Sequence, residues 1–271
     1  MDFEDIRKRG IVLLGCGKMG SAMLAGWLVG GMPAEAVSVI EPYPSDWLKT
    51  VKGLRLNTSL PQDPALVLVA VKPQMMTDAL PSLKNYGGGG TLFLSIAAGT
   101  PLRVYEEVLG DQTPIIRAMP NTPAAVAKGI TALVGNVAAS GEDLGLAEAL
   151  LSAIGQTLRL EDESQMDAVT AVSGSGPAYV FHMIECLTAA GLAEGLPEDL
   201  ALKLAKATVA GAGHLAEHAS ESPAQLRINV TSPGGTTQAG LAHLMEPETG
   251  LSPLIRRTVA AAAQRSRELA S

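Results

Sequence analysis

Two glycine-rich segments near opposite ends of the chain combine residue types that bind anionic ligands. The first runs from Gly15 to Gly20 (Gly-Cys-Gly-Lys-Met-Gly) and matches the pattern G-x-G-x-x-G, between an apolar run and a helical pattern. In that setting the glycines permit a tight turn, a close approach of pyrophosphate to the backbone, and packing of helix on strand. The segment predicts a dinucleotide site; the alternative is a glycine turn that serves packing alone.

The second segment, residues 230–237 (Val-Thr-Ser-Pro-Gly-Gly-Thr-Thr), precedes a helix-like run from Gln238 to Met245. A turn of this composition brings several backbone N–H groups to the start of a helix. Those groups lack intrahelical partners, and the helix dipole adds a partial positive charge, so the position favours an anion. We therefore predict a dinucleotide at one end of the chain and a small acid at the other.

A carboxylate ends the second apolar run of the chain. Glu41 follows Gly20 at about the 20-residue spacing at which an acid hydrogen-bonds the adenosine ribose and favours the unphosphorylated cofactor. Ser45 and Lys49 lie close by in sequence and could instead accept a 2′-phosphate. A solvated charge at a strand end is the third interpretation. These residues slightly favour NADH as the cofactor and do not exclude NADPH.

The elements that must position these residues follow from the apolar pattern. Short apolar runs occur at residues 11–14, 37–40, 65–71, 91–96 and 115–119, with weaker ones at 131–134 and 157–160, and helical patterns lie between them. This alternation predicts a Rossmann-type, doubly wound and mainly parallel sheet over residues 1–162. Residues 163–271 read as an all-α domain rich in small side chains, which we expect to dimerise against a symmetry mate.

Composition excludes several classes of partner. The formal net charge is −7 and aromatic residues make up 3% of the chain, so neither a basic stripe nor a stacking surface for nucleic acid is expected. The first ten residues lack the apolar core of a signal peptide, and no apolar stretch reaches the length of a membrane span. Two widely separated cysteines favour free thiols in a reducing compartment. We expect a cytoplasmic protein with no membrane partner.

The sequence gives little support for a metal site or for a serine nucleophile. His214 and His218 share a helix face, but no third ligand is evident, so no metal site is predicted. Residues 173–179 (Ser-Gly-Ser-Gly-Pro-Ala-Tyr) lack the strand-to-helix setting of a serine nucleophile. Lys72-Pro73, Ala97-Ala98-Gly99 and residues 119–123 end predicted strands, at the edge that faces ligands in open α/β sheets. They can line a ligand site there, and ordinary loops and turns are the equally weighted alternative.

Several segments together closely resemble the pyrroline-5-carboxylate reductase family. They are Gly15–Gly20, Val71–Pro73, Ser95–Gly99, Arg117–Ala124, Asp167–Val180 and Val230–Leu241, in the family's order along nearly the whole chain. The resemblance implies hydride transfer from NADPH or NADH to 1-pyrroline-5-carboxylate, giving L-proline. It also implies an N-terminal Rossmann domain and a C-terminal helical dimerisation domain, with homodimers assembled into a larger oligomer such as a decamer.

The resemblance also implies site residues. Implied cofactor contacts, together with Glu41 from its spacing, are Gly15, Gly17, Lys18, Met19, Gly20, Asn57, Ala70, Val71, Lys72, Pro73, Ala97, Ala98 and Asn229. Implied substrate contacts are Glu163, Thr236 and Thr237, to which the loop adds Ser232, Gly234 and Gly235.

The substrate so implied needs little acid–base help. A protonated cyclic imine accepts hydride directly, so rate would come from proximity and orientation, with backbone N–H groups of Gly234 to Thr237 binding the carboxylate. The hydroxyl of Thr237, the candidate catalytic residue, would contact the ring nitrogen. Because the helical domain is expected to be exchanged about a two-fold axis, the site would be completed by two protomers.

Two other functions compete with this one. A β-hydroxyacid dehydrogenase would need a lysine base at the start of the long helix, where residues 173–179 contain none. A non-catalytic nucleotide-binding protein would have no need of a second anion site.

Overall fold

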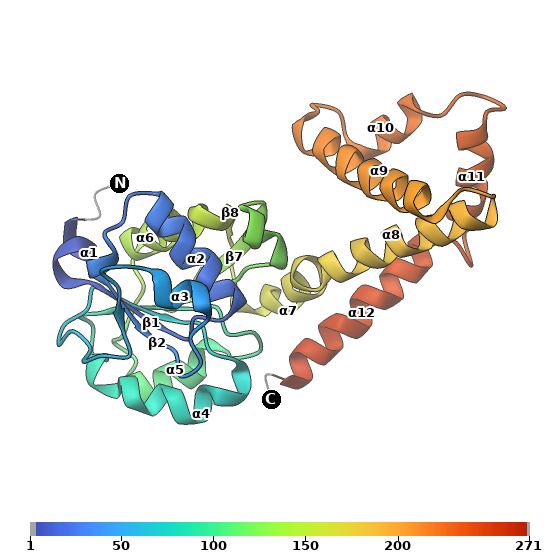
Figure 1. Cartoon of the computed structure of the whole chain (residues 1–271). Coiled ribbons are helices and arrows are strands. Elements are labelled where there is room, and N and C mark those ends of the chain that lie inside the picture. The colour runs from blue at the N-terminus through green and yellow to red at the C-terminus, as the bar shows by residue number, and fades with distance from the viewer. Residues whose placement is uncertain (1–3, 270–271) are drawn as a thin grey trace. The chain divides into compact units, whose positions relative to one another are not determined.

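The computed structural model describes residues 4–269, apart from the side chain of Pro73. The chain forms two compact units (Figure 1). One extends to Gly174 and includes the segment from Ala263 onward, and the other runs from Ser175 to Ala262. These compact units divide after Gly174, and the end of the last helix, from Ala263, belongs to the first unit. The boundary between residues 162 and 163 stays a prediction.

An eight-stranded sheet forms the centre of the first unit. Its order is β3-β2-β1-β4-β5-β6-β7-β8, and all neighbours are parallel except β6 and β7. The strands are β1 Ile11–Leu14, β2 Val37–Ile40, β3 Arg55–Leu56, β4 Leu66–Val69, β5 Leu92–Ser95, β6 Ile115–Met119, β7 Gly129–Gly135 and β8 Gly155–Arg159. The chain leaves β1 towards β2 on one side and later returns to β4 on the other. This reversal creates the crevice in which open α/β sheets bind ligands.

Each predicted apolar run contains or overlaps a strand, so the mainly parallel, doubly wound sheet is confirmed. Two runs are longer in sequence than their strands, because Ala65, Ala70 and Val71 lie outside β4 and Thr91 and Ile96 lie outside β5. β3 was not predicted, since two residues are too short to show an alternating pattern.

Helices cover both faces of the sheet (Figure 1). Alternate residues of β1 point to opposite faces, so Ile11 and Leu13 pack with Trp27 of α2, whereas Val12 and Leu14 pack with Tyr105 of α5. The α-helices of this unit are α1 Glu4–Arg9, α2 Lys18–Val29, α3 Asp46–Thr50, α4 Met76–Ala79, α5 Leu102–Leu109, α6 Gly141–Leu151 and α7 Met166–Val169. Its 3-10 helices are η1 Ala34–Ala36, η2 Pro73–Met75, η3 Leu80–Tyr86, η4 Thr122–Val126, η5 Ser152–Ile154 and η6 Glu163–Gln165.

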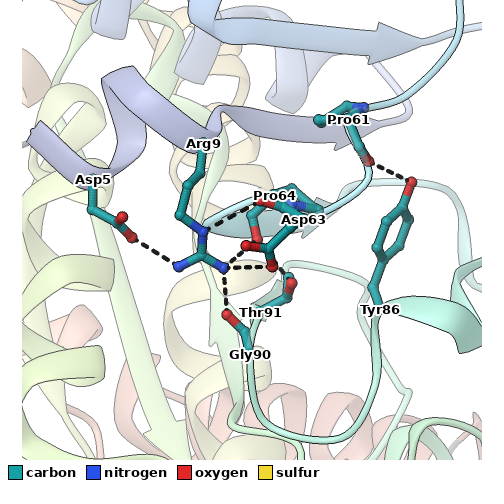
Figure 2. Close-up of polar contacts among 8 residues, drawn as sticks. All are labelled: Asp5, Arg9, Pro61, Asp63, Pro64, Tyr86, Gly90 and Thr91. Atoms are coloured by element: carbon teal, nitrogen blue, oxygen red, sulfur yellow. Dashed lines mark hydrogen bonds and ion pairs between the residues drawn. The ribbon is translucent and has the colours of Figure 1, made fainter.

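Arg9 joins several segments at the edge of the sheet where the strands begin (Figure 2). Its guanidinium forms ion pairs of 2.9 Å with Asp5 and with Asp63, and it donates to the carbonyl oxygens of Asp63, Pro64 and Gly90. The planar, five-donor guanidinium suits such divergent contacts better than an ammonium group. This stabilising cluster lies at the edge opposite to the ligand-facing one.

The second unit is wholly helical. It contains α8 Gly176–Ala193, α9 Glu198–His218, α10 Pro223–Asn229, α11 Thr236–Leu244 and the first part of α12 Leu251–Leu269. A π-helical turn, η7 Thr170–Gly174, precedes α8 in the chain. Among the described helices, none is both long and apolar enough to cross a membrane.

Few side chains are buried within the second unit taken alone. In α8, α10 and α11 no residue is buried, and in α9 only Ala201 and Ala205 are. Large apolar side chains remain exposed, including Phe181 at 58% and Leu215 at 54%. An apolar surface of this kind marks an interaction site.

Candidate active site

The glycine turn connects β1 to α2 in a conformation that side chains would disrupt. Gly15 has φ of +87°, and a Cβ there would lie 2.9 Å from backbone atoms of Ala70 and Val71. A Cβ on Gly20 would lie 2.7 Å from the Gly15 carbonyl oxygen. Both contacts are too short for real atoms, so the close packing of strand and helix requires glycine at both positions.

The start of α2 is open to a ligand. The N-cap residue Gly17 provides no side-chain capping bond, and a Cβ placed on it would meet no atom within 4 Å. The first N–H groups of α2 therefore face open space, with Lys18 as the first helical residue. This is the arrangement by which a helix N-terminus binds a pyrophosphate.

A cavity of about 710 Å³ opens over this turn, within the usual size range of small-molecule sites. Its lining residues are Gly15, Cys16, Gly17, Lys18, Ser21, Glu41, Tyr43, Ser45, Trp47, Ala70, Val71, Lys72 and Met75. They come from the ends of β1, β2 and β4 and from the segments that follow, which is the switch point of the sheet. The cradle and the cavity suit a nicotinamide dinucleotide.

The cavity brings together many of the predicted cofactor residues but not all. Gly15, Gly17, Lys18, Glu41, Ala70, Val71 and Lys72 line it. Met19, Gly20, Asn57, Ala97, Ala98 and Asn229 do not, and Pro73 begins η2 with its side chain outside the described part. Sequence reasoning missed Ser21, Tyr43, Trp47 and Met75. Two aromatic residues so soon after the second strand, in a chain with few aromatics, were the available signal for Tyr43 and Trp47.

Glu41 is fixed by backbone donors. Its Oε2 accepts from the N–H of Cys16 at 2.8 Å and its Oε1 accepts from the N–H of Tyr43 at 3.0 Å. Asn57 forms two reciprocal bonds of 2.9 Å with the backbone of Glu41. Asn57 thus supports the cavity wall behind Glu41 and does not line the cavity itself.

The two residues considered for a 2′-phosphate have other partners. The hydroxyl oxygen of Ser45 caps α3 by accepting from the N–H of Leu48 at 3.2 Å. The ammonium of Lys49 forms an ion pair of 3.1 Å with Asp46. Only Ser45 of the two lines the cavity.

The end of β5 is held by a buried hydroxyl pair. Ser95 and Tyr105 are hydrogen-bonded to each other, and Ser95 Oγ also accepts from the N–H of Ala97 at 3.2 Å. Burial raises the pKa of Tyr105 to about 12, although hydrogen bonds with Ser95 and Thr100 oppose the shift. Tyr105 therefore remains a neutral hydrogen-bonding group, and the pair fixes the segment that begins with Ala97.

Glu163 lies in the first unit and bonds to two other residues of that unit. Its Oε1 accepts from Arg117 Nη1 at 2.6 Å and from the N–H of Leu102 at 2.9 Å. The Arg117 side chain is 7% exposed and that of Glu163 is 29% exposed. The carboxylate thereby links β6 to the start of α5, a structural role that sequence reasoning did not foresee.

In the loop between α10 and α11, some backbone N–H groups already donate to atoms of the loop or of α11. The N–H of Gly234 donates to Gln238 Oε1 at 2.6 Å, and the N–H of Gly235 donates to the carbonyl of Ser232 at 3.0 Å. Of the four N–H groups expected to bind a carboxylate, those of Thr236 and Thr237 remain at the helix start. Within residues 4–269 neither threonine hydroxyl has a hydrogen-bond partner, and both residues are exposed.

Two further polar groups of the second unit have separate surroundings. Asn229 ends α10, and its Oδ1 accepts from Gln225 at 2.8 Å. Glu217 joins His214 and His218 on α9, with possible ligand atoms within 4.8 Å of one another, so a third metal-type side chain is present that the sequence pattern did not suggest. All three residues are exposed.

Comparison with known proteins then gives the family. The family model for pyrroline-5-carboxylate reductase dimerisation matches residues 163–269, and one for coenzyme F420-dependent NADP oxidoreductase matches residues 10–99. A pyrroline-5-carboxylate reductase of Pseudomonas aeruginosa is 37% identical over 265 residues, 96% of each chain. The chain belongs to the pyrroline-5-carboxylate reductase family. A Synechocystis member is 41% identical over 263 residues, covering 95% of this chain and 97% of its own.

Solved structures agree with this family membership. A pyrroline-5-carboxylate reductase from Coxiella burnetii has a TM-score of 0.90 and 32% identity, covering 97% of this chain and 99% of its own. The Plasmodium falciparum pyrroline carboxylate reductase, solved with NADP bound, has a TM-score of 0.84 and 28% identity, covering 98% of this chain and 99% of its own. This pyrroline-5-carboxylate reductase family member thus combines a dinucleotide-binding domain with a helical dimerisation domain.

Proposed function

We propose that this chain reduces 1-pyrroline-5-carboxylate to L-proline with NAD(P)H, the last step of proline biosynthesis. The observation that carries the proposal is the co-occurrence of two binding elements in a member of this family. A cavity of about 710 Å³ surrounds the glycine turn, and the start of α11 offers the N–H groups and free hydroxyls of Thr236 and Thr237. The first suits a dinucleotide and the second a small carboxylate.

The reaction needs binding and orientation more than acid–base catalysis. NAD(P)H supplies the hydride, which forms a bond to the imine carbon, later C5 of proline, while the C=N π electrons move to the ring nitrogen. The iminium proton stays on nitrogen, so the product is the neutral ring amine without transfer from a general acid. An enzyme accelerates such a step mainly by proximity and orientation.

The chain's own residues have distinct roles in this proposal. The N–H groups of Thr236 and Thr237 bind the substrate carboxylate, with Ser232, Gly234 and Gly235 shaping the loop. Gly234 can add its N–H only if Gln238 releases it. The Thr237 hydroxyl contacts the ring nitrogen and orients the imine.

Cofactor binding is assigned to the first unit. The start of α2, with Gly15, Gly17, Lys18, Met19 and Gly20, binds the pyrophosphate. Ala70, Val71, Lys72, Pro73, Ala97 and Ala98 follow β4 and β5 and border the nicotinamide ribose, and Glu41 borders the adenosine, supported by Asn57. Asn229 approaches the nicotinamide side of the cofactor, and Glu163 lies near the substrate.

The second unit also supports a proposal on assembly. Its exposed apolar side chains would be covered by a second copy of the chain, and we propose a homodimer that assembles further, for example into a decamer. The α11 loop of one protomer would then serve the cofactor of its partner. Light scattering should give a mass that is a multiple of two chains, and a mixed dimer of a Gly15→Val and a Thr237→Val chain should recover partial activity. A monomer, or no recovery, would contradict the proposal.

The two cysteines, Cys16 and Cys186, are free thiols. Together with the biosynthetic role, this supports a cytoplasmic location.

An initial-rate assay tests the proposed reaction. We expect oxidation of NADH or NADPH, followed at the nicotinamide absorbance, when 1-pyrroline-5-carboxylate is added, with proline as product. The reverse assay with a β-hydroxy acid and NAD⁺ or NADP⁺ should show no turnover, because residues 173–179 contain no lysine base. Turnover of the hydroxy acid, or of neither compound, would contradict the proposal.

A further inference from the structure

We propose that Glu41 makes this chain prefer NADH over NADPH, an inference that rests on the proposed reductase function. The carboxylate would accept hydrogen bonds from the adenosine ribose hydroxyls and repel a 2′-phosphate. One family neighbour was solved with NADP bound, so a preference for NADH has to be argued from this chain's own residues.

The Glu41 carboxylate has a fixed position on the cavity wall. Bonds from the N–H groups of Cys16 and Tyr43 engage one lone pair on each oxygen, at 2.8 and 3.0 Å. Asn57 binds both backbone groups of Glu41 at 2.9 Å, so the end of β2 is anchored as well. A carboxylate has about four acceptor sites, which leaves free acceptors for two hydroxyl groups. Rotation away from a phosphate would cost both backbone bonds.

The groups near the end of β2 offer a 2′-phosphate little positive charge. Lys49 is paired with Asp46. The hydroxyl oxygen of Ser45 accepts from the N–H of Leu48, so its O–H can still donate, but it carries no charge. Arg55 of β3 pairs with Ser38 of β2 in the strand register. It therefore lies before the carboxyl end of the strands, where Glu41 is found. Among residues 4–269, no arginine follows directly on β2, where dinucleotide folds that accept the phosphate place one.

Two lysines do line the cavity, and their places differ from that of Glu41. Lys18 begins α2, where the pyrophosphate binds. Lys72 follows β4, which lies on the other side of β1 from β2. Lys18 is thus placed for the pyrophosphate and Lys72 for the nicotinamide ribose, so a 2′-phosphate beside Glu41 would meet the carboxylate first. Like charges at about 4 Å disfavour binding by at least tenfold even at a surface-like dielectric.

The test compares the two cofactors in binding and in turnover. The full-length protein is titrated with NADH and with NADPH by nicotinamide fluorescence, and kcat/KM is measured for each with 1-pyrroline-5-carboxylate. The variants are Glu41→Gln and Glu41→Ser, and the control is Glu107→Gln, which removes the same charge from the exposed surface of α5. 5′-AMP and adenosine 2′,5′-bisphosphate are then compared as competitors of the dinucleotide. They differ only in the 2′-phosphate, so their difference in affinity reports the contribution of the adenosine end alone.

The wild-type protein and the control should bind NADH at least about tenfold more tightly than NADPH, and 5′-AMP should compete better than the bisphosphate. Both Glu41 variants should reduce that ratio towards one or reverse it. Equal or tighter binding of NADPH by the wild-type protein, or an unchanged ratio in both variants, would overturn the proposal. Cofactor binding is measured without substrate and does not depend on turnover. Absence of turnover would therefore refute the proposed reaction, whereas the binding ratio would still test the role of Glu41.

Discussion

Arg117 and Glu163 form a largely buried ion pair, with Nη1 of the arginine 2.6 Å from Oε1 of the glutamate. The same oxygen accepts the N–H of Leu102 at 2.9 Å, so one carboxylate joins the central strand β6 to the first turn of α5. α5 also carries Tyr105, which bonds to Ser95 at the end of β5. Glu163 therefore supports the ligand-facing edge of the sheet from behind.

Removing this carboxylate should mainly cost stability. We expect Glu163→Ala to lower the free energy of unfolding by about 2–3 kcal/mol, because Arg117 would keep a buried charge without its partner. Urea denaturation measures the change, and Glu161→Ala, an exposed neighbour, is the matched control. If Glu163→Ala instead raised KM for the imine without loss of stability, Glu163 would be a direct substrate contact.

Asn57 should be replaceable by glycine more easily than by alanine. Its φ is +52°, a conformation in which a Cβ costs roughly 1–2 kcal/mol for residues other than asparagine and glycine. Asn57→Ala and Asn57→Gly both lose the two bonds to Glu41, so their difference in thermal stability reports the backbone cost. Both should weaken cofactor binding and leave KM for the imine unchanged. Equal stability of the two variants would refute this account.

The pair of Glu148 and Arg159 should contribute a pH-dependent stability. The two side chains are joined by bonds of 2.8 and 2.7 Å. The hydrogen bond from Arg159 lowers the pKa of Glu148 below its usual 4.5; burial opposes this shift and the arginine charge adds to it. Because the folded-state pKa is the lower one, the stabilisation is complete above about pH 4.5 and is lost as pH falls through the folded-state pKa.

Glu148→Gln should therefore lower stability at pH 7 by no more than about 1 kcal/mol and have less effect near pH 3. Denaturation curves at several pH values measure the difference, with Glu107→Gln as the control. A destabilisation independent of pH would show that the charge of Glu148 is not responsible.

Thr237 should contribute through its hydroxyl group. Thr237→Val keeps the shape and loses the hydroxyl, and we expect kcat/KM for the imine to fall roughly tenfold to a hundredfold, the value of one hydrogen bond to a charged group. Thr237→Ser keeps the hydroxyl and should stay near the wild-type value. Equal activity of the valine and serine variants would exclude the role.

The features that were predictable from sequence are local ones. The apolar runs, the glycine turn and the helix that follows residues 230–237 each depend on neighbouring residues, so their pattern is visible in the chain itself. That helix was predicted from Gln238 and begins two residues earlier, at Thr236. β3 was not predictable, because a two-residue strand shows no alternating pattern. The aromatic lining by Tyr43 and Trp47 had a weak signal, two aromatic residues close together in a chain with few of them.

The contacts that were not predictable link residues distant in sequence or compete for one group. Arg117 and Glu163 are joined only when η6 reaches β6. The N–H of Gly234 donates to the side chain of Gln238, one helical turn later. The residue pattern of the loop does not indicate whether this N–H binds a ligand or a neighbouring side chain. The end of α12 packs in the first unit, where Ser266 donates to Asp167 at 2.6 Å, a contact between residues far apart in sequence.

The most direct test of the central claim follows the hydride itself. The protein is incubated with 1-pyrroline-5-carboxylate and NADH or NADPH carrying deuterium at nicotinamide C4, prepared separately in its two C4 configurations, and the product is analysed by mass spectrometry and NMR. We predict L-proline with a single deuterium at C5 from one of the two configurations. Proline without deuterium from both, or no proline at all, would contradict the proposed function.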